Sequence, residues 1–378
     1  MQAAMTSSAV SPPAVIQCAR EVRPGGGVCG VAYELERAFD ARGLSVRNFT
    51  LRDIGLPESP VGADDFYGGK LRLLRDVVAY SLLGTFKLWR AGQSAITICH
   101  TDALFGKVYV NHGLHRAALD ASGKKWLMLL RNPLHVFLYV REWARFRFGV
   151  HQHIVCFSKA DADLLVRYFP STAGAISIIP NGVNTRRFFR DEEKRVEFRV
   201  KNGFSQSEFV LCFVGHEFER KGLYPVIEAL SALPREVRLV VAGGRGQMLS
   251  AAKEFAEARG VHDRVTFLGA VRDVEWVMNG SEALIMPSKF EAWPLVGLEA
   301  MACGLPVLLK PTGGISEFLR DGVNGYNILD EPDHIAAVVQ KLLADPQGRE
   351  KMSEAAIATA EQYSWEMIAE RYMALLGK

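Results

Sequence analysis

The sequence of 378 residues lacks the cysteine spacing of a cross-linked or zinc-bound domain. Its six cysteines are far apart and none forms a C-x-x-C pair, which argues against a disulfide framework or a zinc module. Most of them lie inside apolar runs, as Cys99 and Cys212 do. We therefore expect small, buried thiols in a reducing compartment.

Long apolar runs and strong net charge are also missing. No apolar run approaches the ~20 residues that a helix needs to cross a bilayer. The N-terminus has no basic region followed by an apolar one, so we expect a disordered leader over residues 1–12, with Met5 as an alternative start, and no secretory signal. A net charge of +3 is too small to indicate nucleic-acid binding. These absences predict a cytoplasmic protein with no nucleic-acid partner.

Short apolar runs alternate along the chain with glycine-rich or polar loops and helical stretches. Apolar strands without strict polar alternation, separated by helices, predict parallel sheets that are covered on both faces. Two such series predict two doubly wound α/β domains. The expected strands are 14–18, 45–50, 95–99, 107–110, 154–157 and 175–179 in the first series, and 209–214, 238–242, 265–268, 283–286 and 306–309 in the second.

The charge-dense stretch 186–205 is the expected boundary between the domains. The N-terminal domain would then span residues 13–190 and the C-terminal domain residues 191–360. Apolar residues recur at helical spacing near the end of the chain, which predicts a final helix within 361–378.

Two stretches between residues 70 and 148 are rich in Arg, Lys, Trp and Leu. Helices of this composition can lie in a membrane interface, where apolar faces insert and cations meet anionic headgroups. A helix packed on its domain with a basic face in water explains the same composition, so both interpretations stay open. The cations expected to meet an anionic membrane surface or a membrane-bound acceptor are Lys124, Lys125, Arg131, Arg141 and Arg145.

The segment 287–304 has the features of an anion-binding junction between a loop and a helix. It follows the apolar run 283–286, and Pro294 suits a first helical turn because its missing N–H would be unpaired there. The backbone amides of Leu295 and Val296 would then be available to an anion, helped by the helix dipole.

Two carboxylates flank the start of this expected helix. Glu291 lies in the loop before it, and Glu299 lies more than one turn inside it. A carboxylate that deep is better placed to accept hydrogen bonds from sugar hydroxyls than to meet the anion. A solvated surface pair of glutamates is the alternative interpretation.

A second polar segment follows the apolar strand 209–214 and precedes another helical stretch. It contains Arg220 and Lys221, two cations at the carboxyl end of a strand, where ligands bind in doubly wound sheets. Arg grips phosphate oxygens bidentately and Lys acts as a point charge, so the pair could stabilise a diphosphate. An ordinary surface pair at a turn is the alternative.

These elements, in this order and spacing, resemble the retaining glycosyltransferases of family 4, which have the GT-B fold. Glu291 and Glu299 enclose seven residues, as in the Glu–seven residues–Glu signature of the family. Residues 179–184, IPNGVN, are similar to the junction signature IPNGVD, with Asn184 in the place of Asp. The resemblance is specific over residues 150–376 and weaker before them. It implies two Rossmann-like domains facing across a cleft, with a C-terminal helix that returns to the N-terminal domain.

The resemblance also implies residue roles. The catalytic set would be Arg220, Lys221, His112 and Glu291. Within it, Arg220 and Lys221 would neutralise the donor diphosphate, and His112 and Glu291 would contact the donor sugar. Further donor contacts would come from Gly26 and Gly27 near the diphosphate, Leu295 and Val296 through their amides, Glu299 on the ribose, and Val271 and Arg272 on the base. His100 and Asp102 are weaker candidates for contacts to the acceptor or the donor.

The implied reaction moves a hexose from a donor such as UDP-glucose or GDP-mannose to a hydroxyl, with retention at the anomeric carbon. The acceptor would be a bacterial glycan or glycolipid, such as lipopolysaccharide core or exopolysaccharide, and the chain is loosely similar to lipopolysaccharide core α-glucosyltransferases. A peripheral position on the inner face of the cytoplasmic membrane would fit. No metal or other cofactor is expected, because Arg220 and Lys221 would replace a divalent ion.

Three alternatives remain on the sequence alone. A GT-B phosphorylase or a sugar-nucleotide epimerase would use the same donor without an acceptor. A catalytically silent protein that binds nucleotide sugars and docks on membranes would retain the motifs without turnover. A dehydrogenase is disfavoured, because the first loop reads RPGGGVCG and lacks the G-x-G-x-x-G fingerprint.

Overall fold

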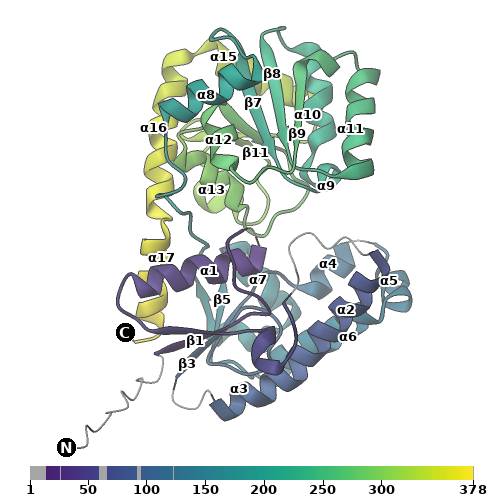
Figure 1. Ribbon diagram of the computed structural model, residues 1–378, viewed down its shortest axis with the longest axis vertical. Helices are drawn as coiled ribbons and strands as arrows, with labels where there is room; N and C mark the ends of the chain where they lie inside the picture. The colour runs from purple at the N-terminus through teal and green to yellow at the C-terminus, as the bar shows by residue number, and fades with distance from the viewer. Residues whose placement is uncertain (1–13, 26, 59–65, 92–94, 122, 378) are drawn as a thin grey trace, which may run out of the picture. The chain divides into compact units, whose positions relative to one another are not determined.

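The computed structural model describes residues 14–25, 27–58, 66–91, 95–121 and 123–377. The expected leader over 1–12 and the donor contact Gly26 lie outside these residues. The chain forms two compact units (Figure 1). Unit 1 comprises the chain to Cys156, Ala162–Ile179 and the chain from Ala369, and unit 2 comprises Phe157–Asp161 and Pro180–Ile368.

Unit 1 contains a parallel sheet in the order β2-β1-β3-β4-β5-β6. After β1 the chain adds β2 on one side, and it then crosses to the other side to add β3, β4, β5 and β6 in turn. The strand order therefore reverses between β1 and β3. The four central strands are largely apolar and buried, as a sheet covered on both faces requires, whereas the edge strands β2 and β6 are partly exposed. They are β1 Val15–Cys18, β2 Val46–Phe49, β3 Ile96–Cys99, β4 Val108–Val110, β5 His153–Cys156 and β6 Ile176–Ile178.

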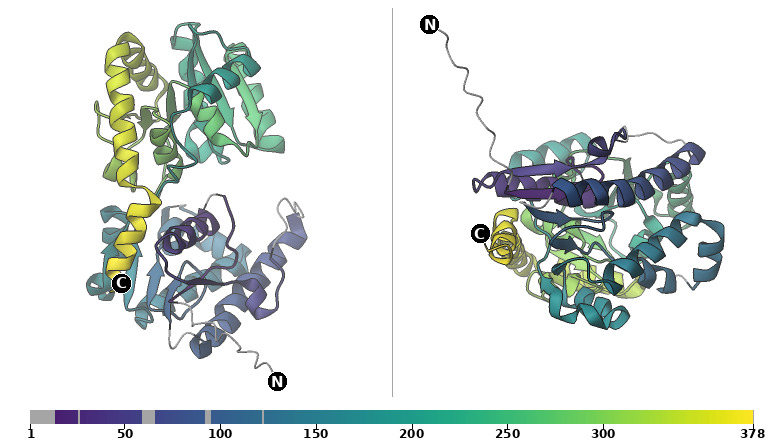
Figure 2. Two further views of the ribbon diagram at one scale, coloured as in Figure 1. Left: turned by 60° about the vertical axis from the view of Figure 1, so that its left-hand side comes forward. Right: turned by 90° about the horizontal axis from the view of Figure 1, so that it is seen from below.

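The helices of unit 1 connect these strands and cover the sheet (Figures 1 and 2). A π-helical turn, η2 Tyr80–Gly84, joins α2 to α3. The helices are α1 Gly27–Asp40, α2 Phe66–Ala79, α3 Thr85–Ala91, α4 His115–Ala121, α5 Lys125–Arg131, α6 Pro133–Arg147 and α7 Lys159–Tyr168, with short 3₁₀ turns η1 Leu51–Ile54 and η4 Pro170–Ala175.

Unit 2 contains a second parallel sheet, in the order β12-β11-β10-β7-β8-β9. Here the order reverses between β7 and β10. Strand β12 has no counterpart among the expected strands, because its three residues, GYN, form no apolar run. The strands are β7 Phe209–Val214, β8 Val237–Ala242, β9 Val265–Gly269, β10 Ala283–Met286, β11 Val307–Leu309 and β12 Gly325–Asn327.

The helices of unit 2 complete a doubly wound arrangement, so the predicted α/β class with two such domains is confirmed (Figure 1). They are α8 Glu192–Asn202, α9 Phe218–Lys221, α10 Leu223–Ala229, α11 Gly246–Ala258, α12 Val274–Asn279, α13 Leu295–Ala302, α14 Ile315–Phe318, α15 Pro332–Ala344 and α16 Pro346–Gln362, with 3₁₀ turns η5 Leu230–Ala232 and η6 His262–Arg264.

The last helix, α17 Trp365–Leu375, begins in unit 2 and ends in unit 1. At its start, the amide of Trp365 donates to the carbonyl of Val183 (3.2 Å), which explains why the segment after Pro180 belongs to unit 2. At its end, Tyr372 packs edge-on against Phe39, with ring centroids 6.3 Å apart. Within the described part of the chain, no helix combines the length and apolarity that crossing a membrane would require.

Candidate functional site

The carboxyl edge of the sheet in unit 2 brings Arg220, Lys221 and Glu291 together. The short helix α9 follows β7, and the loop that carries Glu291 follows β10, so both come from the point where the strand order reverses. Lys221 Nζ lies 2.9 Å from Glu291 Oε1, and Arg220 Nη1 lies 3.3 Å from the same oxygen. Residues that are 70 positions apart in sequence thus form one ionic cluster.

A glycine permits this close approach of the two loops. Gly222 separates α9 from α10 and has φ +78°, a left-handed conformation that favours glycine. A Cβ atom at Gly222 would lie 2.6 Å from the carbonyl oxygen of Pro287, which begins the Glu291 loop. Any larger residue would therefore force the two loops apart.

The cluster is close to electrically balanced, because each cation already has a carboxylate partner. Arg220 Nη2 pairs with Glu217 Oε2 at 2.6 Å, and its Nη1 also donates to the carbonyl of Phe290. Hydrogen bonding to Arg220 lowers the pKa of Glu217. Ser288 Oγ donates to Glu291 (3.1 Å), so this buried carboxylate has three partners.

Glu217 and Ser288 belong to the cluster but were not singled out from the sequence. Glu217 stands three residues before Arg220, a spacing at which opposite charges pair on a helix, and this was the available signal. Ser288 gave no comparable signal, because a serine in a loop after a strand is common.

The start of α13 offers two backbone amides. Pro294 occupies the N-cap position, and its carbonyl accepts from the amide of Gly297 (3.0 Å). Among the described residues, no group accepts a hydrogen bond from the amides of Leu295 and Val296. Glu299 lies more than one turn inside the helix and is half-buried, as the sequence predicted.

The loop after β9, which contains Val271 and Arg272, is held in place by a side chain from another segment. Arg187 Nη2 donates to the carbonyl of Arg272 (2.8 Å) and pairs with Glu275 at 2.8 Å. Val271 is half-buried and Arg272 is exposed. The loop therefore presents its backbone from a fixed position in unit 2.

The carboxyl edge of the sheet in unit 1 carries a hydrogen-bonded chain that ends at His112. Gln17 Nε2 donates to the carbonyl of Ala32 (3.0 Å), so its Oε1 accepts from His100 Nε2 (2.9 Å). The Nδ1 atom of His100 must then accept from Nε2 of His112, at 3.3 Å. This chain fixes the tautomers of both imidazoles. Burial lowers the pKa of His100 to about 4 and, with His100 beside it, lowers that of His112 as well.

Asp102 lies at the same edge between two arginines. Its carboxylate is 2.6 Å from Arg20 Nε and 2.6 Å from Arg141 Nη1. Burial would raise the pKa of Asp102, but the two guanidiniums outweigh it and lower that pKa. His100 is 0% and Asp102 3% exposed, and their contact with the acceptor or the donor stays a prediction. Both hold other side chains in position.

The cations expected at a membrane separate into two groups. Arg145 is 3% exposed, donates to the carbonyls of Thr101 and Ala103, and stacks on Tyr109 with its Cζ 4.1 Å from the ring centroid. Arg141 is largely buried by its pairing with Asp102. The guanidinium groups of both arginines thus bind partners inside unit 1, and their expected contact with anionic headgroups stays a prediction.

The remaining expected cations lie on or beside α5. Lys124 and Arg131 are exposed, whereas Lys125 is half-buried and pairs with Asp120 at 3.0 Å. At the start of α1, Gly27 is exposed and has φ +71°, a conformation that suits a glycine-rich loop entering a helix.

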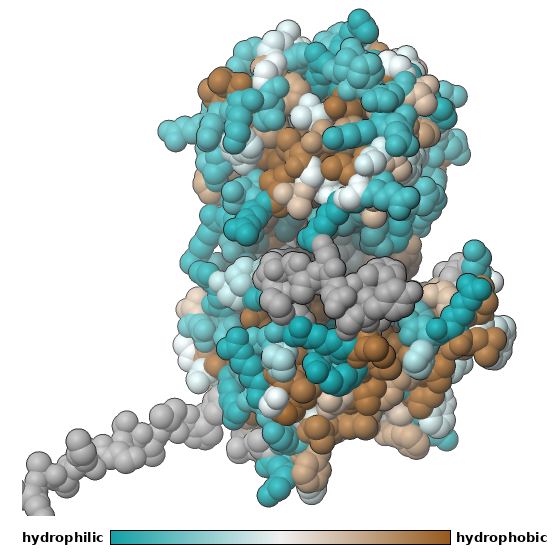
Figure 3. All heavy atoms as spheres, turned by 45° about the vertical axis from the view of Figure 1, so that its right-hand side comes forward, coloured by the Kyte–Doolittle hydropathy of each residue, from teal (hydrophilic) through white to brown (hydrophobic). Residues whose placement is uncertain are grey.

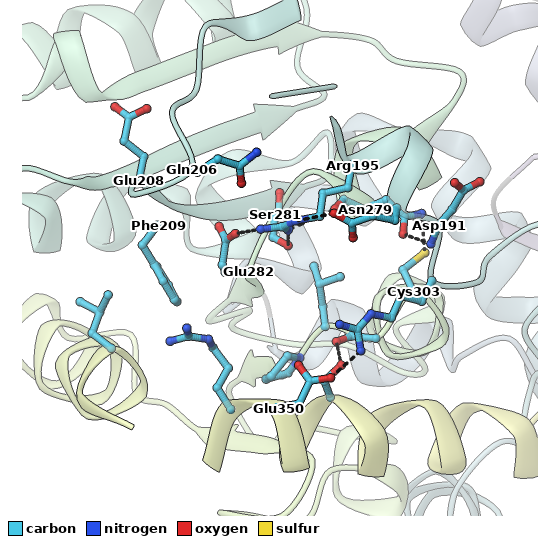
Figure 4. A pocket seen from close by; sticks show the side chains of 18 of the residues that line it. Asp191, Arg195, Gln206, Glu208, Phe209, Asn279, Ser281, Glu282, Cys303 and Glu350 are labelled. Atoms are coloured by element: carbon cyan, nitrogen blue, oxygen red, sulfur yellow. Dashed lines mark hydrogen bonds and ion pairs between the residues drawn. The ribbon is translucent and has the colours of Figure 1, made fainter. Parts of the chain in front are cut away.

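A separate polar pocket lies at the amino edge of the sheet in unit 2, opposite the ionic cluster. It is lined by residues at the starts of strands, including Phe209, Ser281 and Glu282. Figure 4 shows Arg195 pointing to Glu282. Two of its arginines, Arg190 and Arg195, pair with the lining carboxylates of Glu350 and Glu282. Because ligands in such sheets bind at the carboxyl edge, we do not assign a site here. No group of three or more potential metal ligands occurs within the described ranges.

Comparison with known proteins places the two units in two related families. Residues 25–187 match the family described as Glycosyltransferase Family 4, and residues 194–359 match Glycosyl transferases group 1. A D-inositol 3-phosphate glycosyltransferase of Xylanimonas cellulosilytica is 28% identical over 91% of this chain and 89% of its own length. A lipopolysaccharide 1,2-N-acetylglucosaminetransferase of Salmonella typhimurium is 28% identical, over 53% of this chain and 56% of its own length.

Solved structures share the fold over nearly the whole chain. WaaG, a glycosyltransferase involved in lipopolysaccharide biosynthesis, superposes with a TM-score of 0.75 at 23% identity, covering 96% of this chain and 99% of its own. The Anabaena protein Alr3699/HepE, solved in complex with UDP and glucose, gives a TM-score of 0.69 at 17% identity, covering 97% of this chain and 100% of its own. At these identities the likeness concerns the fold.

Proposed function

This chain belongs to the glycosyltransferases of family 4 and group 1 and has the GT-B fold, and from this premise we propose a specific reaction. It moves a hexose from a nucleotide diphosphate sugar to a hydroxyl of a glycan or glycolipid, with retention at the anomeric carbon. The observation that carries this proposal is the cluster of Arg220, Lys221 and Glu291 at the strand-order reversal of unit 2.

Donor binding in this proposal is an exchange of partners. Without donor, Lys221 and Arg220 share the carboxylate of Glu291. The diphosphate would take over the two cations, together with the amides of Leu295 and Val296. Glu291 would then turn its oxygens to hydroxyls of the donor sugar, and Glu299 would accept from the ribose. The ionic cluster and α13 would therefore together supply groups for the sugar, the diphosphate and the ribose of the donor.

A front-face route is the mechanism that we propose for retention. The leaving diphosphate takes the acceptor proton, while Arg220, Lys221 and the helix amides stabilise its growing negative charge. A double displacement would need a carboxylate beneath the anomeric carbon. Glu291 is the only candidate for that position in the described part of unit 2, and its three hydrogen-bonding and ionic partners suit a binding role better than nucleophilic attack.

The acceptor class is proposed from the names of two relatives, of which the second acts on lipopolysaccharide. Their names give lipopolysaccharide and inositol phosphate as the substrates of those proteins. We propose a glycan or glycolipid of the bacterial envelope, such as lipopolysaccharide core or exopolysaccharide. A related structure was solved with UDP-glucose, which makes this sugar the first donor to test.

A panel of UDP- and GDP-sugars tests the reaction. We expect hydrolysis of one donor in the absence of acceptor to exceed that of the others at least tenfold, because the base and sugar are each recognised. With an acceptor glycolipid, nuclear magnetic resonance of the product should show the anomeric configuration of the donor. An inverted product would contradict the mechanism. Rearranged sugar from donor alone would indicate an epimerase, and binding of every donor without turnover would indicate a silent binder.

Chelation provides a second test. Because Arg220 and Lys221 supply the positive charge that a divalent ion would otherwise bring to the diphosphate, we expect full turnover in excess EDTA. The measurement is the initial rate with and without chelator, followed by addition of Mg²⁺ or Mn²⁺. A rate that falls in EDTA and returns with either ion would overturn metal independence without affecting the assignment as a transferase.

A further inference from the structure

Unit 1 exposes an unusual number of large apolar side chains on α2, η2, α3, α5 and α6. Figure 3 shows apolar residues gathered on this unit. Leu130 is 86% exposed and Trp126 is 75% exposed, values that are unfavourable in water for side chains of this size. The others, which together with these two we call the apolar surface, are Leu71, Leu73, Leu82, Leu83, Phe86, Trp89, Leu127, Val136, Val140, Trp143 and Phe148.

The apolar side chains follow the helical repeat rather than being scattered. On α6, Val136, Val140 and Trp143 recur at spacings of four and three residues, which places them on one stripe. The opposite stripe of the same helix contains Glu142 and Arg145, which are buried in unit 1. Helix α6 therefore buries charged side chains on its inward face and exposes apolar side chains on its outward face.

The π-helical turn η2 and α3 contribute a second stripe beside the first. Leu82, Phe86 and Trp89 recur at the same helical spacing, and the last two rings are 6.4 Å apart. Arg141 of α6 donates to Ser81 of η2 at 3.0 Å, which fixes the two stripes as neighbours within unit 1.

On these helices the acidic side chains are buried and the exposed charged side chains are basic. Within 71–91 and 123–150, the only carboxylates are Asp76 and Glu142, and both are buried. The backbone amides of His115 and Arg116 donate to the carboxylate of Glu142, which holds this negative charge inside unit 1. The exposed charged side chains of the same segments are all basic: Arg75, Lys87, Arg90, Lys124, Arg131 and Arg147.

We propose that this surface docks on an anionic lipid bilayer. Exposed tryptophan, phenylalanine and leucine side chains would enter the interfacial region, while the surrounding cations meet lipid phosphates. The absence of exposed carboxylates within 71–91 and 123–150 favours an anionic partner surface over a neutral one. The cations that would contact lipid phosphates are the exposed ones, not the buried Arg141 and Arg145.

Another exposed apolar pair gives a contrast within the same molecule. Val196 and Val200 lie on α8 in unit 2, and Val200 is 76% exposed. They are flanked by three carboxylates, Glu192, Glu193 and Glu197, and by one cation, Lys201. Those carboxylates would repel an anionic surface, so this pair serves as a matched control for exposed apolar area without the favourable charge.

Vesicle co-sedimentation tests the proposal. The full chain should associate with phosphatidylglycerol–phosphatidylcholine vesicles at low salt, and less in high salt. Replacing Leu82, Phe86 and Trp89 together by serine should lower the partition coefficient at least tenfold. Replacing Arg131 and Arg147 by glutamine should lower it roughly fivefold for each cation on anionic vesicles. The control variant V196S/V200S should bind as the unaltered chain does.

Other outcomes would overturn the proposal. No sedimentation with anionic vesicles at low salt would do so, as would unchanged binding of the triple serine variant. If light scattering shows a dimer that the triple variant converts to a monomer, and neither form binds vesicles, the occupant is a second copy of this chain. Lipid binding is measured without any sugar donor, so its failure is distinguishable from failure of the proposed transfer reaction.

Discussion

Replacing Lys221 by alanine is expected to lower turnover at saturating donor about 10²–10³-fold, the usual cost of removing one group that stabilises developing negative charge. In the proposed reaction that charge grows on the leaving diphosphate. Lys221 is held for this task by its contact with Glu291 (2.9 Å) and by close packing of its stem on Gly215. The measurement is the single-turnover rate at several donor concentrations, which separates turnover from donor affinity.

A neighbouring cation supplies the matched control. Lys289 lies in the same loop as Glu291 but is 52% exposed and pairs with Glu219, away from the cluster. Because an exposed ion pair contributes little free energy, Lys289→Ala should change turnover less than twofold. Near wild-type turnover of Lys221→Ala at saturating donor would count strongly against the front-face mechanism.

A structural role for Lys221 predicts a different result. Removing the lysine leaves Glu291, which is buried, with Arg220 and Ser288 as partners, and an under-paired buried carboxylate destabilises a fold. The double variant Lys221→Ala with Glu291→Gln removes that carboxylate charge. The unfolding midpoint of the double variant should therefore recover, which measures the destabilisation caused by the under-paired carboxylate. Because Glu291 itself belongs to the proposed catalytic set, turnover is compared in the single variant alone, at a temperature well below its unfolding midpoint. If Lys221 were only structural, the folded single variant should turn over as the unaltered chain does; we expect its turnover to remain low.

The sequence predicted eleven of the twelve described strands because nearly all of these are short apolar runs between polar loops; β12 is not such a run and was missed. Strands β7 Phe209–Val214 and β10 Ala283–Met286 have the expected bounds, and the other predicted strands differ by one residue at one or both ends. Once strands are placed, parallel topology brings the residues after them to one edge. That rule is sufficient to bring Lys221 together with Glu291, and His100 with His112.

The sequence could not show partners that are distant along the chain. Arg141 stands among exposed residues on a basic, aromatic helix, and its pattern resembles that of a solvated cation. Its partner Asp102 lies 39 residues earlier, after another strand, and no local pattern connects the two. Gln17 gave a usable signal, since an amide inside the buried strand β1 must find hydrogen-bonding partners.

The stability of unit 1 should depend on pH because His100 is buried as a neutral imidazole. Its Nδ1 accepts a hydrogen bond from Nε2 of His112. Protonation of His100 Nδ1 would place two N–H donors opposite each other and break this hydrogen bond. Burial lowers the pKa of His100 to about 4, from about 6.5 in an unfolded chain. His151, also buried, has its pKa lowered to about 3 by burial and by the charge of Arg145.

Between pH 6.5 and 4 the unfolded chain therefore binds a proton at His100 that the folded chain does not bind. Because the unfolded state carries more protons, the free energy of unfolding must fall as the pH is lowered through this range. His100 alone should account for roughly 3 kcal/mol of that loss. Urea unfolding of the full chain at a series of pH values measures the slope. The variant His100→Gln should have a shallower slope whatever its stability at neutral pH, whereas His262→Gln, at an exposed position, should leave the slope unchanged. An unaltered slope in His100→Gln would show that His100 is not buried in its neutral form.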